Sequence, residues 1–120
     1  MLPKSHQQEL SIWLELLKSF DLLFFENSNN SLEVQQSWQK IQDYLHTRIM
    51  IFNSEDLTVN NRSLFQSWQR ETYRYIRLLQ TDFSFYQSAK QISTKQSRFL
   101  IIKQRLNEVI NLTKNYGNFQ

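Results

Sequence analysis

The sequence contains no cysteine, and its 120 residues include only one glycine and one proline. Without cysteine the chain can form no disulfide framework, and it offers neither a thiol nucleophile nor a thiolate metal ligand. Strand-rich folds need special turn residues at many corners, so the scarcity of glycine and proline predicts a chain with few corners. A glycine-rich phosphate loop is excluded because the single glycine is Gly117. These absences favour a handful of long helices.

Long apolar runs and targeting signals are also lacking. Residues 22–25 and 99–102 are apolar runs of four, far short of the roughly 20 residues needed to cross a bilayer. The first nine residues are polar, and Glu15, Asp21 and Glu26 interrupt the apolar region that follows, so no signal peptide is expected. The sequence therefore predicts a soluble protein without a membrane partner, and we expect it in the cytoplasm.

The clearest pattern that is present is a helical stripe over residues 65–86. Its apolar residues recur at steps of three and four, which places them on one face of an α-helix. Such a helix spans roughly 33 Å, enough to run the length of a small bundle. The stripe consists of Phe65, Trp68, Tyr75, Ile76, Leu79, Phe83 and Tyr86, with Thr72 in the one gap.

Three other segments show the same periodicity, and a chain of this length suffices for one core. We predict a single all-α domain, an up-down bundle of about four helices over residues 5–27, 31–53, 61–91 and 94–115. The inward residues expected in the other helices are Leu10, Trp13, Leu14, Leu17, Phe20, Phe24 and Phe25 in the first, Val34, Trp38, Ile41, Leu45, Ile49 and Phe52 in the second, and Phe99, Ile102, Leu106, Val109 and Ile110 in the last.

The ends of these helices are predicted from capping residues. Residues 27–31 are polar and form the clearest loop. The expected N-caps are Ser5, Ser31, either Asn61 or Ser63, and Thr94, with Gly117 as the terminator of the last helix. Ser54 could instead open the third helix early. A kink rather than a loop remains an alternative over residues 91–95.

No set of residues suggests catalysis or metal binding. His6 lies at the start of the chain and His46 lies off the apolar stripe of its helix, so both are expected to face solvent. The chain lacks the Glu-x-x-His pairs of di-iron bundles. The aromatic residues of the stripes are expected to form core rather than a cofactor pocket. We therefore predict no catalytic residue, no metal, no cofactor and no enzymatic activity.

Charge is distributed unevenly along the chain. Residues 1–60 contain four Lys or Arg against eight Asp or Glu, a net charge of −4, whereas residues 61–120 contain ten against three, a net charge of +7. This asymmetry suggests either an acidic partner for the second half or packing of one half against the other.

The candidate binding residues lie in the basic half. Arg70, Arg74 and Arg77 share the helical face opposite Trp68, with Tyr73 at its edge. Arginine beside an exposed aromatic ring suits phosphate, base or carboxylate groups.

Arg98 and Arg105 are predicted to extend that contact. With Ile101 and Leu112 they form a second, mixed strip on the last helix, of a kind more typical of protein contacts than of nucleic-acid grooves. A nucleic-acid-binding regulator and an ordinary solvated surface remain alternatives. Ile12, Leu16 and Leu23 form a second apolar strip on the first helix, which could make a homodimer.

The opening sequence MLPKSHQQ, the length, and the glutamine-rich, cysteine-free, all-helical character resemble the heterocyst frequency control protein PatD family of filamentous cyanobacteria. The resemblance implies a small cytoplasmic regulator of heterocyst number rather than an enzyme. It also implies binding to the tubulin-like division protein FtsZ and promotion of its assembly. No individual binding residue is implied by it.

Overall fold

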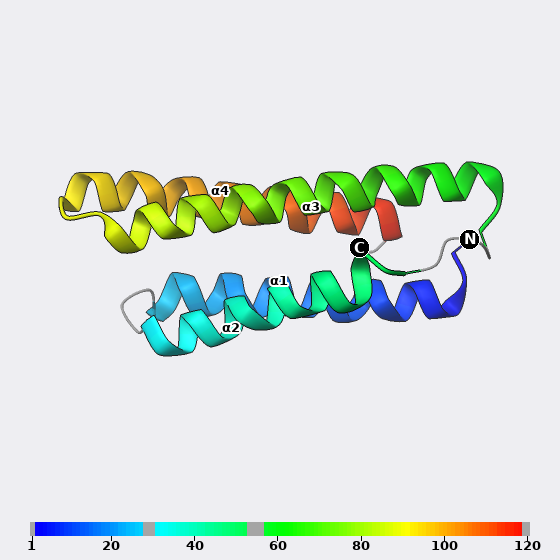
Figure 1. Ribbon diagram of the computed structural model, residues 1–120, viewed down its shortest axis with the longest axis horizontal. Helices are drawn as coiled ribbons and strands as arrows, with labels where there is room; N and C mark the ends of the chain where they lie inside the picture. The colour runs from blue at the N-terminus through cyan, green and yellow to red at the C-terminus, as the bar shows by residue number, and fades with distance from the viewer. Residues whose placement is uncertain (1, 28–30, 53–56, 119–120) are drawn as a thin grey trace.

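The computed structural model describes residues 2–27, 31–52 and 57–118. These residues form the helices α1 (Lys4–Asn27), α2 (Ser31–Tyr44), α3 (Val59–Ser88) and α4 (Ile92–Gly117), and a π-helical segment, η1 (Leu45–Ile49), continues α2. Consecutive helices run in opposite directions along a body of 50 by 25 by 21 Å (Figure 1). The predicted all-α, up-down bundle is confirmed.

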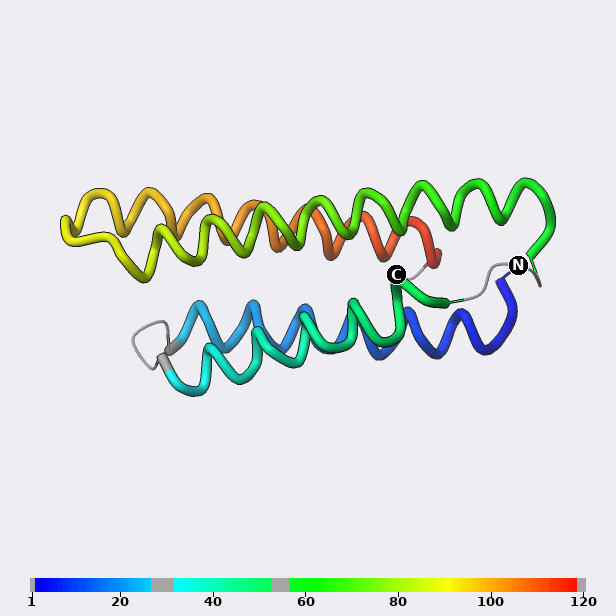
Figure 2. Tube along the Cα trace, in the orientation of Figure 1, coloured from blue at the N-terminus to red at the C-terminus, as the bar shows by residue number. Residues whose placement is uncertain are grey.

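The bundle has two layers, each made of one helical hairpin. The α1–α2 hairpin forms one layer and the longer α3–α4 hairpin forms the other, with α1 beside α4 (Figure 1). Trp38 on α2 donates a hydrogen bond to Gln80 on α3, so these two helices meet on the other side of the bundle. The turn between α3 and α4 extends beyond the end of α1, as the trace in Figure 2 shows.

The apolar stripes meet in an aromatic-rich core. Phe24 is fully buried, and its ring centroid lies 5.1 Å from that of Phe99, 5.3 Å from Tyr86 and 5.6 Å from Phe83. Residues from α1, α3 and α4 thus converge on one side chain. Thr72, which fills the gap in the α3 stripe, is also fully buried.

Phe25 was predicted to face the core, and that prediction is wrong. Its side chain is 60% exposed, while its neighbour Phe24 occupies the interior. Successive residues of an α-helix point about 100° apart, so both rings cannot be directed at the same core. Phe52, Tyr75 and Phe99 are only partly buried.

The prediction that His6 faces solvent is also wrong. Its side chain is 3% exposed, and its ring centroid lies 4.2 Å from that of Phe52 and 5.3 Å from that of Phe65, edge to face in both cases. The N–H of Gln7 donates to the carbonyl of Pro3, so the helix has already begun at this point. His6 therefore sits in the first turn of α1 and packs on α3. His46 is exposed, as predicted.

Several helix ends differ from the predicted caps. Thr58, rather than Asn61 or Ser63, caps α3: its hydroxyl accepts from the N–H of Asn61 at 3.3 Å. The left-handed residue that ends α4 is Asn118, with φ 61°, whereas Gly117 is the last helical residue. Asparagine tolerates this conformation because its short polar side chain bonds locally.

The remaining predicted helix ends differ from the observed ends by up to four residues or lie outside the described residues; the helix predicted over residues 31–53 ends at Ile49. Ser5 lies inside α1, and Ser31 is the first residue of α2. α4 begins at Ile92 after Gln91, so Thr94 is already helical, and the chain turns back sharply over residues 89–91 rather than kinking. Ser54 and residues 28–30 lie outside the described residues.

The second helix ends in a π-helical turn. The N–H of Met50 donates to the carbonyl of Leu45 at 2.8 Å, which is the five-residue spacing of a π-helix. The Gln69 side chain of α3 donates to the carbonyl of Ile49 at 2.8 Å and lies 3.3 Å from that of Met50. A side chain of the opposite layer thus satisfies carbonyl groups that a helix end leaves unpaired.

Across the described ranges, no helix combines the length and the hydrophobicity that crossing a bilayer would require.

Candidate interaction surface

The predicted arginine cluster lies on the outer side of α3. Arg70, Arg74 and Arg77 are exposed and Tyr73 is half-buried. Arg70 and Arg74 follow the buried Trp68 and Thr72 by two positions, a rotation of about 200° that turns them away from the core. We call Arg70, Tyr73, Arg74 and Arg77 the α3 arginine face.

Neighbouring side chains orient two of these guanidinium groups. Arg74 donates to Glu71 at 3.0 Å, and its Cζ lies 5.0 Å from the ring centroid of Tyr75. The hydrogen bond and the charge of Glu71 raise the pKa of Arg74, so this guanidinium stays charged at any physiological pH. Arg77 lies over the ring of Tyr73, 5.8 Å from its centroid. Both contacts are exposed and contribute little stability, but they restrict where the charges point.

His46, which the sequence did not indicate as a contact residue, adjoins this face. Its ring meets that of Tyr73 edge to face, with the centroids 6.4 Å apart. Because His46 belongs to η1, the α3 arginine face continues across the seam between α2 and α3. A single helical wheel carries no signal for such a contact, since it depends on which helix lies alongside.

Arg98 and Arg105 do not extend the α3 arginine face. Nε of Arg105 lies 2.7 Å from Oδ2 of Asp82, and Nη1 of Arg98 lies 3.5 Å from Oδ1 of the same residue. Asp82 is 4% exposed, and each arginine side chain is about one-third exposed. These two arginines join α4 to α3 around a buried carboxylate. Ile101 and Leu112, which accompany them in sequence, are half-buried.

The uneven distribution of charge along the sequence corresponds to a difference in net charge between the two layers. The half with net charge −4 contains α1 and α2, and the half with net charge +7 contains α3 and α4. Of the ion pairs between described residues, Lys103–Asp21 at 2.6 Å joins the two layers, and the other four each stay within one layer. Among the described residues, the acidic hairpin therefore supplies no ion-pair partner to the α3 arginine face, where Arg74 pairs with Glu71 of its own helix.

The second apolar strip of α1 is largely covered. Leu16 and Leu23 are partly buried and pack against the core, while Ile12 is 45% exposed. This strip offers less apolar surface for a homodimer than the sequence indicated.

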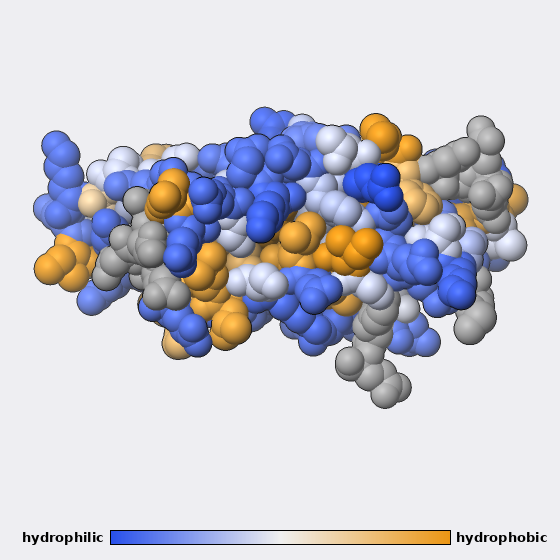
Figure 3. All heavy atoms as spheres, turned by 90° about the horizontal axis from the view of Figure 1, so that it is seen from below, coloured by the Kyte–Doolittle hydropathy of each residue, from blue (hydrophilic) through white to orange (hydrophobic). Residues whose placement is uncertain are grey.

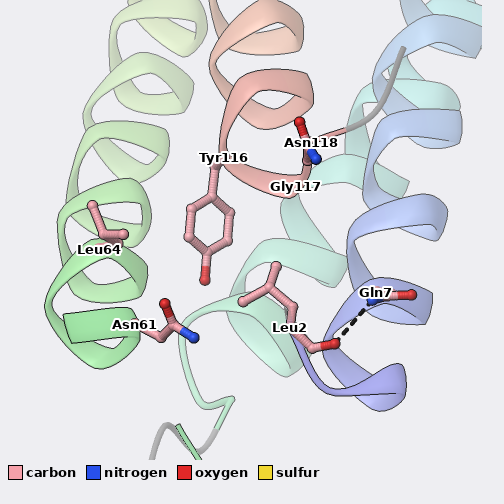
Figure 4. Close-up of a pocket in the computed structure, with 7 residues that line it drawn as sticks. All are labelled: Leu2, Gln7, Asn61, Leu64, Tyr116, Gly117 and Asn118. Atoms are coloured by element: carbon pink, nitrogen blue, oxygen red, sulfur yellow. Dashed lines mark hydrogen bonds between the residues drawn. The ribbon is translucent and has the colours of Figure 1, made fainter. Parts of the chain in front are cut away.

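A cavity of about 450 Å³ lies at the end of the bundle, between the start of α1, the start of α3 and the end of α4 (Figure 4). The described residues that line it carry no charged side chain; they are Leu2, Gln7, Asn61, Leu64, Tyr116, Gly117 and Asn118. The Tyr116 side chain extends between Leu64 and Leu2, and its buried hydroxyl has no hydrogen-bond partner among the described residues (Figure 4).

Burial makes this tyrosine resist ionisation. Desolvation raises the pKa of Tyr116 to about 12, compared with about 10 in an unfolded chain. For Tyr44, burial and then the hydrogen bond to Glu9 raise the pKa as well. A raised pKa in the folded state means that the stability these groups contribute is intact below pH 10 and is lost as the pH rises through their folded-state pKa, which for Tyr116 is about 12.

We therefore expect tyrosinate absorbance at 295 nm to rise in two phases during an alkaline titration. The late phase should lie near pH 12 or coincide with the loss of helical circular dichroism. Replacing Tyr116 by Phe should shrink that late phase. A single phase near pH 10 in a protein that is still helical would contradict the assigned burial.

Comparison with known protein families, with curated proteins and with solved structures found no match to this chain. Within the described parts of the chain, no three His, Asp or Glu side chains gather as metal ligands would. The α3 arginine face presents planar, positively charged hydrogen-bond donors next to aromatic rings. Such groups bind carboxylates and other anions.

Proposed function

We propose that this protein is a non-enzymatic regulator that acts by binding another protein through the α3 arginine face. The observation that carries the proposal is the exposed row of Arg70, Arg74 and Arg77 beside Tyr73 and His46, in the layer with net charge +7. A guanidinium group can form two parallel hydrogen bonds with one carboxylate, so the matching partner presents acidic side chains.

Two carboxylates favour a protein partner over a nucleic acid. Glu71 lies among the arginines and pairs with Arg74, and the exposed Asp43 belongs to the adjoining helix α2. A phosphate backbone carries negative charge at short, regular intervals, so it would meet repulsion at both positions. An acidic protein surface can avoid them by the placement of its own side chains.

The proposed partner is the division protein FtsZ. This choice rests on the resemblance of the opening sequence, the size and the all-helical character to the PatD family. By the same resemblance, we propose that binding promotes FtsZ assembly and that the protein is a cytoplasmic regulator of heterocyst number.

The test is co-sedimentation with purified FtsZ and GTP at near-physiological salt. We expect the protein to enter the pellet and to increase the amount of polymer. Its absence from the pellet, together with an unchanged amount of polymer, would refute the proposal. Co-sedimentation without additional polymer would support binding and contradict promotion of assembly.

The second candidate is a nucleic-acid-binding regulator, which the net charge of +7 in the α3–α4 half favours. Binding to phosphates weakens steeply with salt, with a slope that reflects the number of phosphates contacted. A salt series from 50 to 200 mM with duplex DNA therefore separates the candidates. Binding to DNA that persists near physiological salt, without binding to FtsZ, would favour this second function.

A further inference from the structure

Three chemically different strips run side by side along the outer side of α3. The middle strip is the row of Arg70, Arg74 and Arg77, which follow one another at intervals of four and three residues. Successive residues of an α-helix are rotated by about 100° and rise by about 1.5 Å, so these three lie within an arc of about 60° and span roughly 10 Å along the axis. They therefore form one narrow, straight row of cations.

An aromatic strip flanks the arginine row on the side of α2. Tyr73 precedes Arg74 by one residue, so its side chain is turned about 100° from that arginine. Its ring meets that of His46 edge to face, which places it on the α2 side of the row. Arg77 leans to this side, over the Tyr73 ring. Tyr73 is half-buried and His46 is exposed, so both rings are accessible to a partner.

An acidic strip flanks the arginine row on the side of α4. Glu71 follows Arg70 by one residue, on the side away from the aromatic strip, and accepts a hydrogen bond from Arg74 at 3.0 Å. Arg74 also lies over Tyr75, whose pKa is raised by burial and then by its hydrogen bond to Glu108 of α4. Glu71 is about half exposed and Glu108 is exposed, so two carboxylates border the row here.

We infer that the partner element recognised by the α3 arginine face is an α-helix that lies along α3 and carries acidic, apolar and basic side chains on three separate strips. This inference rests on the proposed function of that face. Its acidic strip meets the arginine row, its apolar strip meets Tyr73 and His46, and its basic strip meets Glu71 and Glu108.

The arrangement of the three strips favours a helix over an extended segment. A β-strand directs its side chains to only two faces, so it cannot match three strips at once, whereas a helix directs side chains all around its axis. Acidic residues at intervals of four and three in the partner helix also have the same spacing along the axis as the arginines that they meet.

The layer of α1 and α2 does not suit such a helix. Figure 3 views the molecule from this side, where apolar atoms lie in separate clusters among hydrophilic ones. These two helices belong to the half of the chain with net charge −4, so they repel an acidic strip. In the other layer, Arg98 and Arg105 already pair with Asp82, whereas the arginine row of α3 is open.

The first test uses two synthetic helical peptides of identical composition. The matched peptide carries three glutamates at intervals of four and three residues, with leucines on one side of them and lysines on the other. The permuted peptide spreads the same residues around the helix, and circular dichroism verifies equal helicity. By fluorescence anisotropy at low salt, we expect the full chain to bind the matched peptide at least about 10-fold more tightly. Equal affinity would overturn the inference, because net charge alone would then explain binding.

A third peptide tests the helical conformation itself. It is the matched peptide with a central proline, which breaks the helix, and its affinity should fall to that of the permuted peptide. Binding as tight as that of the matched peptide would overturn the inference and assign an extended acidic segment to the face.

The second test fixes the orientation of the partner helix through Glu71. A variant of the matched peptide has its lysines replaced by glutamates, and the ratio of its affinity to that of the matched peptide is measured for each protein. Glu71→Lys should shift this ratio several-fold in favour of the glutamate variant. Glu26→Lys is the matched control, because it makes the same change at an exposed acid of α1 and should leave the ratio unchanged. Equal shifts in both proteins would contradict the contact between the basic strip and Glu71.

These outcomes are distinct from failure of the proposed function. If the protein co-sediments with FtsZ but binds no peptide even at millimolar concentration, the inference is wrong and the proposed function stands. If the matched peptide binds the wild type but not the variant with Arg70, Arg74 and Arg77 replaced by glutamate, while FtsZ does not co-sediment, the helix-binding face is supported and the choice of partner is wrong. Peptide binding that survives this triple replacement would overturn the inference.

Discussion

Replacing Arg70, Arg74 and Arg77 by glutamate is expected to abolish co-sedimentation with FtsZ, while the helical circular dichroism stays unchanged. The three side chains are exposed, so their replacement removes no core contact. Each reversal turns an attraction to a partner carboxylate into a repulsion. Losses at several positions of one interface should together weaken binding by at least about 100-fold.

The matched control reverses three other exposed cations, Lys18, Lys40 and Lys90. Both triple variants change the net charge of the chain by the same amount, but the control leaves the α3 arginine face intact. Its co-sedimentation should equal that of the wild type. If both variants lose binding equally, net charge rather than this surface governs the interaction. If neither loses it, the assignment of the surface is wrong.

A substitution at Tyr73 separates the contribution of the aromatic ring to binding from that of the arginine charges. Tyr73→Ala removes the ring that lies between Arg77 and His46 and keeps all three arginines. We expect a smaller loss of affinity than for the triple reversal, about 10-fold, with an unchanged salt dependence. Binding that is unaffected by this substitution would restrict the contact to the guanidinium groups.

The fold could be predicted from the sequence because its signal is local. The spacing of Phe65, Trp68, Thr72 and Ile76 places them on one face of one helix. That this face is buried could be predicted without knowing which other helix packs against it. The scarcity of glycine and proline further indicated that the helices are long. Helix ends were placed less well because alternative caps such as Thr58 and Asn61 differ by only about 1 kcal/mol.

The candidate site was predicted only in part because contacts between helices are not local. Arg70, Arg74 and Arg77 share a helix, and their common face follows from their spacing. The pairing of Arg105 with Asp82 joins two helices across a turn, and the meeting of His46 with Tyr73 joins α2 to α3. Burial of His6 depends in the same way on Phe52 and Phe65. A helical wheel places such residues on outer faces because it does not contain the neighbouring helix.

Removing the buried carboxylate by Asp82→Ala is expected to destabilise the fold by about 2–3 kcal/mol. Removing one partner of a buried ion pair typically costs about 3–5 kcal/mol because the remaining charge is left uncompensated. Here the side chains of Arg98 and Arg105 stay about one-third exposed, so water offsets part of the loss. Urea unfolding followed by circular dichroism should show a lower midpoint with an unchanged slope.

Two further variants test whether the unpaired charge of the arginines causes this loss of stability. Glu71→Ala removes the exposed acid that pairs with Arg74 on the same helix, and should change stability by less than about 0.5 kcal/mol. Adding Arg105→Met to Asp82→Ala should recover part of the lost stability, because it removes the cation closest to the vacated carboxylate. If the double variant is less stable than Asp82→Ala by the full cost of losing another packed side chain, the two residues are energetically independent. Asp82 would then stabilise the bundle through its packing rather than through its charge.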